Sequence, residues 1–197
     1  MSHSLQEQIL VVLNSVLFAQ NPVWQGIQKD DQVITSTIST IITHQEYIQR
    51  SLAEENQNYK QIIPYLIFKF TNTYFVMQRK ITASEQRLAG KLSLGIGGHM
   101  RKEDMEGKTI FEWAQREFHE EVSYSGNLKI RTLGILNDDS NDVGKVHLGI
   151  VLLVEGDNNN IFIKNEHKTG KLMTQQECLE QFDAMENWSQ TILRFLL

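Results

Sequence analysis

The segment Arg116-Glu117-Phe118-His119-Glu120-Glu121-Val122 brings three carboxylates onto one helical turn. On a helix, Glu117, Glu120 and Glu121 are related as i, i+3 and i+4, so their side chains project from one face. Like charges at these spacings destabilise a helix by about 0.2–0.5 kcal/mol per pair. A Mg²⁺ or Mn²⁺ ion would relieve this repulsion, because these ions bind hard oxygen ligands, and it would then polarise phosphate oxygens. The alternative is a solvated helix face, which is what most charge runs are.

The composition indicates one substantial globular domain, or one domain with an N-terminal extension. The chain has 197 residues, of which 41% are hydrophobic and 22% are charged. Its formal net charge of -5 gives no electrostatic footprint for a nucleic-acid backbone, so we expect no nucleic-acid partner. Cys178 is the only cysteine, which excludes an intrachain disulfide and fits a reducing compartment. We expect Cys178 to be a structural core residue, because it lies in a helical pattern over residues 175–182.

The N-terminal apolar stretch, residues 9–19, does not have the features of a signal peptide or a membrane anchor. Asn14 and Ser15 interrupt it, no Lys or Arg precedes it, and it is too short to span a bilayer. We therefore expect a cytoplasmic protein without a membrane partner.

Residues 1–60 differ in character from residues 61–197. The first segment carries no chemical motif, and we expect an extension that packs on the core or on a second subunit, which would give a homodimer. Residues 9–18 are rich in Val, Leu and Ile and predict a strand, or a hairpin around Asn14-Ser15. Residues 38–59 are polar and are predicted to be mostly helical.

The second segment mixes strands and helices without regular alternation, which favours a mixed sheet between helices. Thr109 is a plausible N-cap for the glutamate-bearing helix, and Glu112 completes a capping box. The predicted strands cover residues 65–70, 74–78, 91–96, 129–136, 146–154 and 161–164, and the predicted helices cover residues 109–123, 174–184 and 188–196.

This order of a strand, Gly97-Gly98, a loop and a helix with three glutamates resembles the Nudix family. The Nudix box consists of Gly, five residues, Glu, seven residues, then Arg-Glu-hydrophobic-any-Glu-Glu-any-Gly. The residues that match it are Arg116, Glu117, Phe118, Glu120 and Glu121. The resemblance covers residues 64–197, is greatest to a bacterial group of predicted MutT-type phosphoesterases, and implies an α/β/α sandwich with a mixed sheet plus the N-terminal extension.

The box is degenerate in this chain. Lys108 stands where the family has Glu, Ser123 stands where it has Gly, and the interval from Gly98 to Arg116 is longer by four residues. An acid in the longer loop would have to replace the missing carboxylate. The candidates for that replacement are Glu103, Asp104 and Glu106.

The resemblance implies a Mg²⁺- or Mn²⁺-dependent hydrolase that cleaves the pyrophosphate bond of a nucleoside diphosphate linked to another moiety. Glu117, Glu120 and Glu121 would hold the ions, and Arg116 would orient the glutamates. Gly97 and Gly98 would let the backbone approach the helix and a phosphate. The alternative is a catalytically degenerate Nudix-fold module that binds a nucleotide or a partner without turnover, and Lys108 is its main support.

Two further signals have simpler interpretations. Asp138, Ser140 and Asp142 alternate as in a calcium loop, but the Gly and Glu that such a loop requires are missing. We interpret the segment as a turn built by Asx side chains, while Asp139 could instead orient water or ligand. His147 lies in a strongly apolar segment and is interpreted as a satisfied core histidine rather than a substrate contact.

Overall fold

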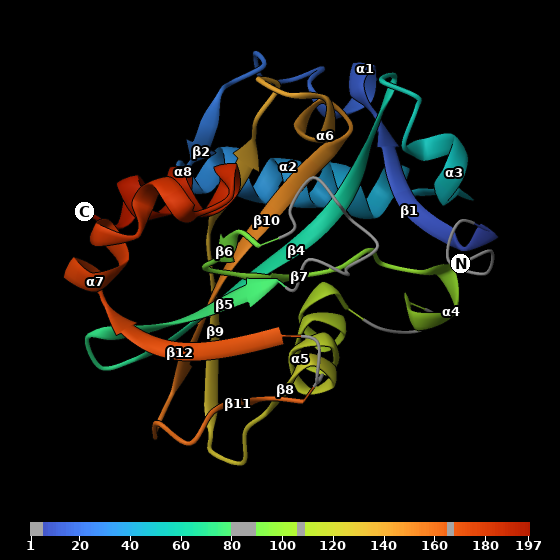
Figure 1. Ribbon diagram of the computed structural model, residues 1–197. Helices are drawn as coiled ribbons and strands as arrows, with labels where there is room; N and C mark the ends of the chain where they lie inside the picture. The colour runs from blue at the N-terminus through green and yellow to red at the C-terminus, as the bar shows by residue number, and fades with distance from the viewer. Residues whose placement is uncertain (1–5, 80–89, 106–108, 165–167) are drawn as a thin grey trace. The chain divides into compact units, whose positions relative to one another are not determined.

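The computed structural model describes residues 6–79, 90–105, 109–164 and 168–197 (Figure 1). The strands are β1 (Gln8–Leu13), β2 (Gly26–Gln28), β3 (Glu46–Gln49), β4 (Tyr59–Phe70), β5 (Thr73–Arg79), β6 (Leu92–Ser93), β7 (Ile96–Gly97), β8 (Val122–Ser123), β9 (Leu128–Asn137), β10 (His147–Gly156), β11 (Phe162–Ile163) and β12 (Lys168–Thr174). The helices are α1 (Asn14–Leu17), α2 (Asp31–His44), α3 (Arg50–Ala53), α4 (Lys102–Met105), α5 (Ile110–Glu121), α6 (Asp142–Lys145), α7 (Gln175–Glu180) and α8 (Asn187–Leu196), with a 3₁₀ turn at Phe182–Ala184.

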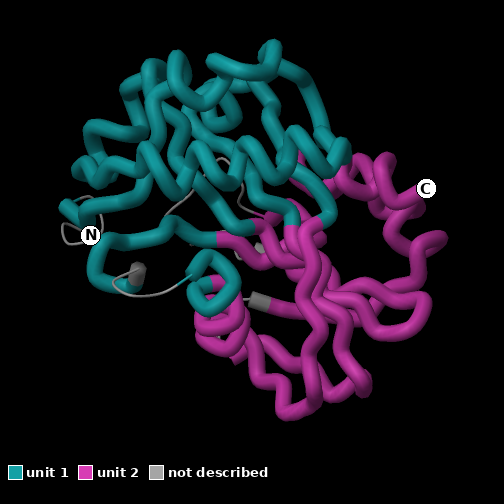
Figure 2. Tube along the Cα trace, turned by 180° about the vertical axis from the view of Figure 1, so that it is seen from behind, with its two compact units in different colours: residues 1–64, 98–113, 133–151 teal, residues 65–97, 114–132, 152–197 magenta. Residues whose placement is uncertain are grey.

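The chain divides into two compact units, each assembled from three separate stretches of sequence (Figure 2). The principal sheet has the strand order β12-β5-β4-β10-β9-β2. The first unit comprises residues 1–64, 98–113 and 133–151, and the second comprises residues 65–97, 114–132 and 152–197.

In the first unit, the N-terminal strand pairs on both of its edges. Strand β1 is antiparallel to β3 and to the beginning of β4, with Val11 opposite both Glu46 and Gln61. Ile9 and Val11 are fully buried and pack with Ala53 at the end of α3. The N-terminal segment is therefore an integral part of the core of this unit.

In the second unit, helices cover both faces of strand β4. Tyr65 meets Trp188 of α8 with ring centroids 5.6 Å apart, and Phe68 stacks on Phe118 of α5 at 5.7 Å. Because successive side chains of a strand point to opposite faces, Tyr65 and Phe68 lie on opposite sides of β4. The almost unbroken run of buried residues along β4 is typical of a strand covered on both faces. This arrangement confirms the predicted α/β sandwich.

The structure also corrects several expected elements. Residues 14–17 form helix α1 rather than the second arm of a hairpin, and Asn14 donates from its side chain to the Gln57 carbonyl oxygen (2.6 Å). Residues 38–59, predicted to be mostly helical, contain β3, because Tyr47 and Ile48 pair with β1. Strand β12 has no counterpart among the predicted strands. Among the described residues, no helix is long and apolar enough to cross a membrane.

Candidate functional site

The glutamate-bearing helix α5 begins at the predicted capping box. The Thr109 backbone N–H donates to Glu112 Oε2 at 2.8 Å, and the Glu112 backbone N–H donates to Thr109 Oγ1 at 3.2 Å. Each bond satisfies an N–H group that has no acceptor within the helix, so the box fixes the residue at which α5 starts. The position of every side chain further along the helix follows from this start.

One face of α5 is anchored by an aromatic cluster in the second unit. Phe118 is fully buried, stacks on Phe68, and meets the Tyr124 ring edge-on with centroids 6.2 Å apart. The glutamates at the neighbouring positions are more accessible, with Glu117 16% and Glu120 54% exposed at the side chain. The helix therefore buries Phe118 and leaves the Glu117 and Glu120 side chains partly exposed.

Arg116 contacts two of the three predicted ligands. Its Nη1 donates to Glu120 Oε1, and its Nη2 lies 4.0 Å from Glu117 Oε2. Glu121 is the last residue of the same helix and is partly buried. The structure thus places Arg116 beside Glu117 and Glu120, and its part in orienting them stays a prediction.

The two predicted glycines fall in different units. Gly97 ends strand β7 and pairs with Tyr65 of β4, in the second unit, whereas Gly98 belongs to the first unit.

Two of the loop acids offered as a replacement for the missing carboxylate, Glu103 and Asp104, are engaged in ion pairs. Arg101 Nε lies 2.6 Å from Asp104 Oδ2 and 3.8 Å from Glu103 Oε1. Glu106 and Lys108 lie outside the described residues. The part that any of these side chains takes in metal binding stays a prediction.

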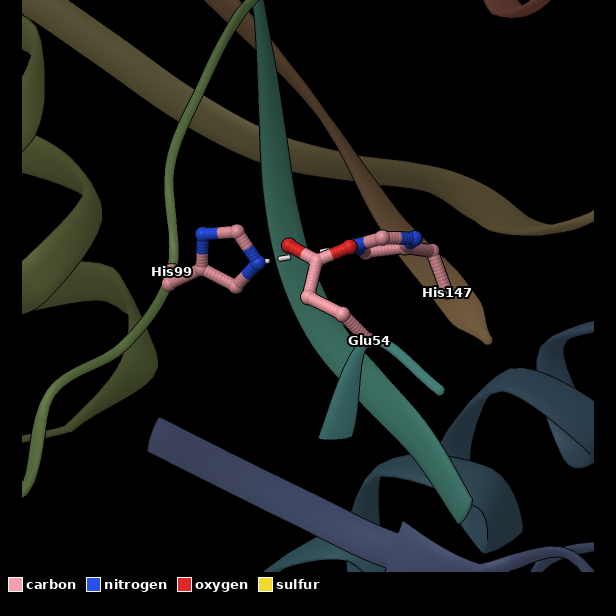
Figure 3. Close-up of side chains that lie close together, drawn as sticks. All are labelled: Glu54, His99 and His147. Atoms are coloured by element: carbon pink, nitrogen blue, oxygen red, sulfur yellow. Dashed lines mark hydrogen bonds between the residues drawn. The ribbon is translucent and has the colours of Figure 1, made fainter. Parts of the chain in front are cut away.

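A second cluster of ligand-type side chains lies in the first unit, and no spacing motif in the sequence indicates it. The carboxylate and imidazole atoms of Glu54, His99 and His147 all lie within 4.8 Å of one another (Figure 3). Glu54 caps the C-terminal end of α3, His99 follows β7, and His147 is the first residue of β10. Among the described residues, no other group of three or more such side chains meets this distance.

The two imidazoles of this cluster face each other. His99 Nε2 lies 3.4 Å from His147 Nε2 and 2.7 Å from Gln61 Oε1. Burial, with smaller contributions from the charges of Arg50 and His147, holds the pKa of His99 well below its ordinary value. His99 is therefore neutral at pH 7, and its Nε2 carries the ring proton, because the Gln61 oxygen beside it can only accept a hydrogen bond.

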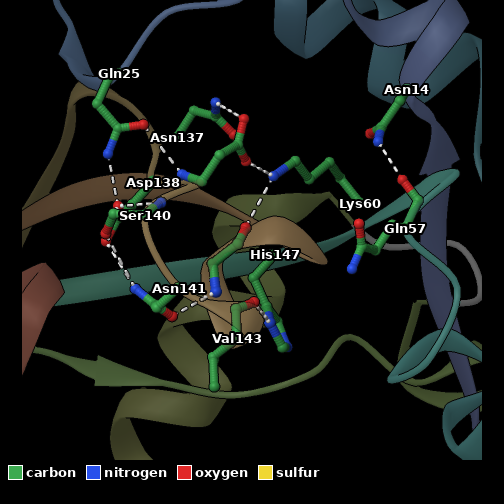
Figure 4. A network of polar contacts seen from close by, with 12 residues as sticks. Asn14, Gln25, Gln57, Lys60, Asn137, Asp138, Ser140, Asn141, Val143 and His147 are labelled. Carbon is green, nitrogen blue, oxygen red and sulfur yellow. Dashed lines mark hydrogen bonds and ion pairs between the residues drawn. The ribbon is translucent and has the colours of Figure 1, made fainter.

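The loop that leads to His147 is held by a polar network in the same unit (Figure 4). Asp138 accepts hydrogen bonds from the Ser140 backbone N–H (3.1 Å) and hydroxyl (2.6 Å), which is the expected Asx turn. The buried ammonium of Lys60 donates to Asp139 Oδ1 (2.6 Å) and to the Gly144 carbonyl oxygen (2.8 Å). Asp139 thus has a structural partner.

Comparison with known proteins decides the family. No family model matches the chain. It is 32% identical over 204 residues to Protein YmaB of Bacillus subtilis (strain 168), covering 98% of both chains. It is 26% identical to Tm1382, whose own assignment as a Nudix hydrolase is provisional, with a TM-score of 0.81 over 97% of this chain and 98% of Tm1382. The chain belongs to the Nudix family, in the group that contains YmaB.

A more distant Nudix structure agrees with this fold. The NUDIX domain of Shewanella oneidensis NrtR, solved with ADP ribose, is 11% identical, with a TM-score of 0.53 over 70% of this chain and 84% of that domain. The predicted Nudix assignment, made from the glycine pair, the helix residues and the flanking strands, is confirmed by the likeness to Tm1382.

Proposed function

We propose that this Nudix protein is a Mg²⁺- or Mn²⁺-dependent hydrolase of the pyrophosphate bond in a nucleoside diphosphate linked to another moiety. The observation that carries the proposal is the set of three glutamates on the capped helix α5, with Arg116 beside two of them. A polyanionic pyrophosphate must be neutralised before water attacks phosphorus, and carboxylates on one helix are suited to hold the ion that does this.

The donor set fits the ions. Glu117, Glu120 and Glu121 offer only hard carboxylate oxygens, and a partly exposed helix face leaves room for the water ligands that Mg²⁺ retains. A bound ion would supply charge neutralisation on the phosphate oxygens and a lowered pKa of bound water.

The chain's own residues have separate tasks in this proposal. Glu120 and Glu121 bind the ion, and Glu117 binds it or takes a proton from the attacking water. Arg116 is a positioning residue, because its guanidinium holds Glu120 through a charge-assisted hydrogen bond. Gly97, which lies in the same unit as the three glutamates, provides backbone without a side chain, so that a phosphate can approach it closely.

The substrate class is supported by chemistry and by the distant likeness. The ADP ribose bound to the NrtR domain is a nucleoside diphosphate linked to a sugar, and it occupies a protein of the same fold. The net charge of -5 argues against a polyanionic nucleic-acid strand and favours a small anion held through a metal.

The test is a screen of nucleotide-linked pyrophosphates with purified protein, with and without Mg²⁺ or Mn²⁺. We expect metal-dependent release of a nucleoside monophosphate. Glu120→Gln and Glu121→Gln should each lower turnover by about 100-fold or more, because each removes a ligand charge and preserves the side-chain shape. Glu180→Gln, the same change on the exposed face of α7, is the control. Hydrolysis by either α5 variant at the parent rate with saturating Mg²⁺ would exclude the glutamate assignment.

The second candidate, a binding module without turnover, is favoured by Lys108 in place of the Nudix glutamate. It predicts that calorimetry detects nucleotide binding while the same screen detects no hydrolysis with either metal.

A further inference from the structure

The cluster of Glu54, His99 and His147 has the composition of a transition-metal site. Two imidazole nitrogens and one carboxylate are a ligand set of zinc sites, whereas Mg²⁺ and Ca²⁺ prefer oxygen alone. The three side chains come from separate segments of the first unit and point toward one another (Figure 3). Their convergence is a property of the folded chain.

The orientation of the His147 ring is fixed by a hydrogen bond on the nitrogen that faces away from the cluster. Its Nδ1 lies 2.6 Å from the Val143 carbonyl oxygen, which can only accept a hydrogen bond, so Nδ1 carries the proton. In the neutral ring, Nε2 then holds a lone pair, and this atom faces His99. A backbone carbonyl on the far ring nitrogen is the usual way in which a metal-binding histidine is held in the correct tautomer.

The spacing of the two rings suits an ion better than a direct hydrogen bond. The Nε2 atoms are 3.4 Å apart, which is longer than the usual 2.7–3.2 Å hydrogen bond. Two nitrogens that bind a tetrahedral Zn²⁺ at about 2.0–2.1 Å are about 3.3 Å apart. The observed separation therefore equals that of two ligands on one ion.

Gln61 adds an independent observation at the same place. Its side chain is fully buried, its Oε1 lies 2.7 Å from His99 Nε2, and its amide nitrogen has no hydrogen-bond partner within the described part of the chain. The oxygen and the nitrogen of a buried side-chain amide normally both make hydrogen bonds. The Gln61 oxygen accepts the hydrogen bond from His99 Nε2, so an ion bound there would take the place of that proton and leave the ring proton on Nδ1.

We propose that Glu54, His99 and His147 bind one divalent transition-metal ion, with Zn²⁺ preferred. The ion would join the end of α3, the segment after β7 and the start of β10, and water would complete its coordination. The site does not depend on the proposed hydrolase activity, because its ligands differ in chemistry and in residues from those on α5. Metal binding at such a site adds to the stability of the fold that forms it.

The experiment uses Co²⁺ as a spectroscopic substitute for Zn²⁺. Full-length protein stripped with a chelator is titrated with Co²⁺, and visible d–d absorption is recorded. We expect saturation at one Co²⁺ per chain, loss of the absorption when Zn²⁺ is added, and a melting temperature that rises with either ion. Absence of intense absorption at one equivalent would overturn the proposal and leave a hydrogen-bonded histidine pair.

Substitutions of single side chains test which residues bind the ion. Glu54→Gln and His99→Gln should each weaken Co²⁺ binding by about 100-fold or more, because loss of an outer partner alone costs 10–100-fold. His44→Gln, at an exposed histidine of α2, is the matched control. Glu120→Gln should keep the Co²⁺ spectrum, so failure of this proposal and failure of the hydrolase proposal are distinguishable.

Of the two variants, Glu54→Gln is the one expected to stay folded, since the Glu54 side chain is 23% exposed and its replacement by Gln preserves shape. Circular dichroism checks the fold of each variant. A folded Glu54→Gln protein that binds Co²⁺ with the parent affinity and spectrum would overturn the assignment.

Discussion

Lys60 shows how one side chain organises a loop. Its side chain is 2% exposed, yet it carries an ammonium, and burial lowers its pKa while hydrogen bonding to Asp139 opposes that shift. A buried charge persists only when its hydrogen bonds are made. The bonds to Asp139 and to the Gly144 carbonyl meet this need, and they tie the loop before His147 to strand β4.

Lys60→Met should therefore destabilise the protein by about 1–3 kcal/mol. Methionine fills similar volume but leaves the Gly144 carbonyl oxygen without its donor. Lys145→Met is the matched control, because the pair of Lys145 with Asp142 is exposed and its loss should cost about 0.5 kcal/mol or less. Urea unfolding measures both, and equal small losses would contradict the structural role of Lys60.

Cys178 is predicted to be unreactive in the folded protein. Burial, with a smaller contribution from Glu177, raises the pKa of its thiol to about 11. The folded pKa lies above that of the unfolded chain, so the linked stability is present below the unfolded pKa and is lost as pH rises toward 11. At pH 8 the thiolate population is about 100-fold smaller in the folded state.

Maleimide labelling should thus be slower by about 100-fold or more in buffer than in urea, and mass spectrometry of this single cysteine measures it directly. Labelling at the same rate in both solutions would show that the thiol is accessible.

At the scale of elements, the start of α5 controls the placement of the glutamates. Thr109→Ala removes the side-chain acceptor of the capping box and should cost about 0.5–2 kcal/mol. Thr35→Ala, the same change at an exposed position inside α2, should be neutral or slightly stabilising because alanine favours helix interiors. Thermal unfolding of the two variants makes the comparison. An equal effect at both positions would mean that the cap does not fix α5.

Helix α5 could be predicted because its signals are local. The capping box and the i, i+3, i+4 spacing both lie within residues 109–121 and are read without knowing the rest of the fold. Strand β12 could not be predicted in this way. Its beginning, Lys168-Thr169-Gly170-Lys171, is polar, and it is a strand because residues 168–174 pair with β5. It lies at the end of the strand order, where polar and charged residues are tolerated.

The two candidate sites also differ in whether their residues are neighbours in the sequence. The α5 glutamates are neighbours in sequence, so their proximity follows from helical geometry alone. His99 and His147 are 48 residues apart, and His147 was interpreted as a satisfied core histidine. That interpretation holds in part, because Val143 satisfies one ring nitrogen. The other nitrogen meets His99 only through tertiary structure, and no spacing rule could reveal that contact.

At the scale of the molecule, the N-terminal segment is expected to be indispensable for a stable fold. Val11→Lys should destabilise the protein by about 3 kcal/mol or more, because it places an unpaired charge at a fully buried position of β1. Gln8→Lys is the control on the same strand, since Gln8 is exposed. Melting temperature and soluble yield measure the difference. A soluble Val11→Lys protein with the parent melting temperature would contradict this expectation.

The interleaving of the two units in the sequence limits how their coding segments can be exchanged between genes. The backbone passes from one unit to the other after residues 64, 97, 113, 132 and 151, so neither unit corresponds to a continuous piece of gene. A recombination event at any single junction would transfer incomplete parts of both. Exchange of either unit as a single module would therefore require several crossovers in one gene.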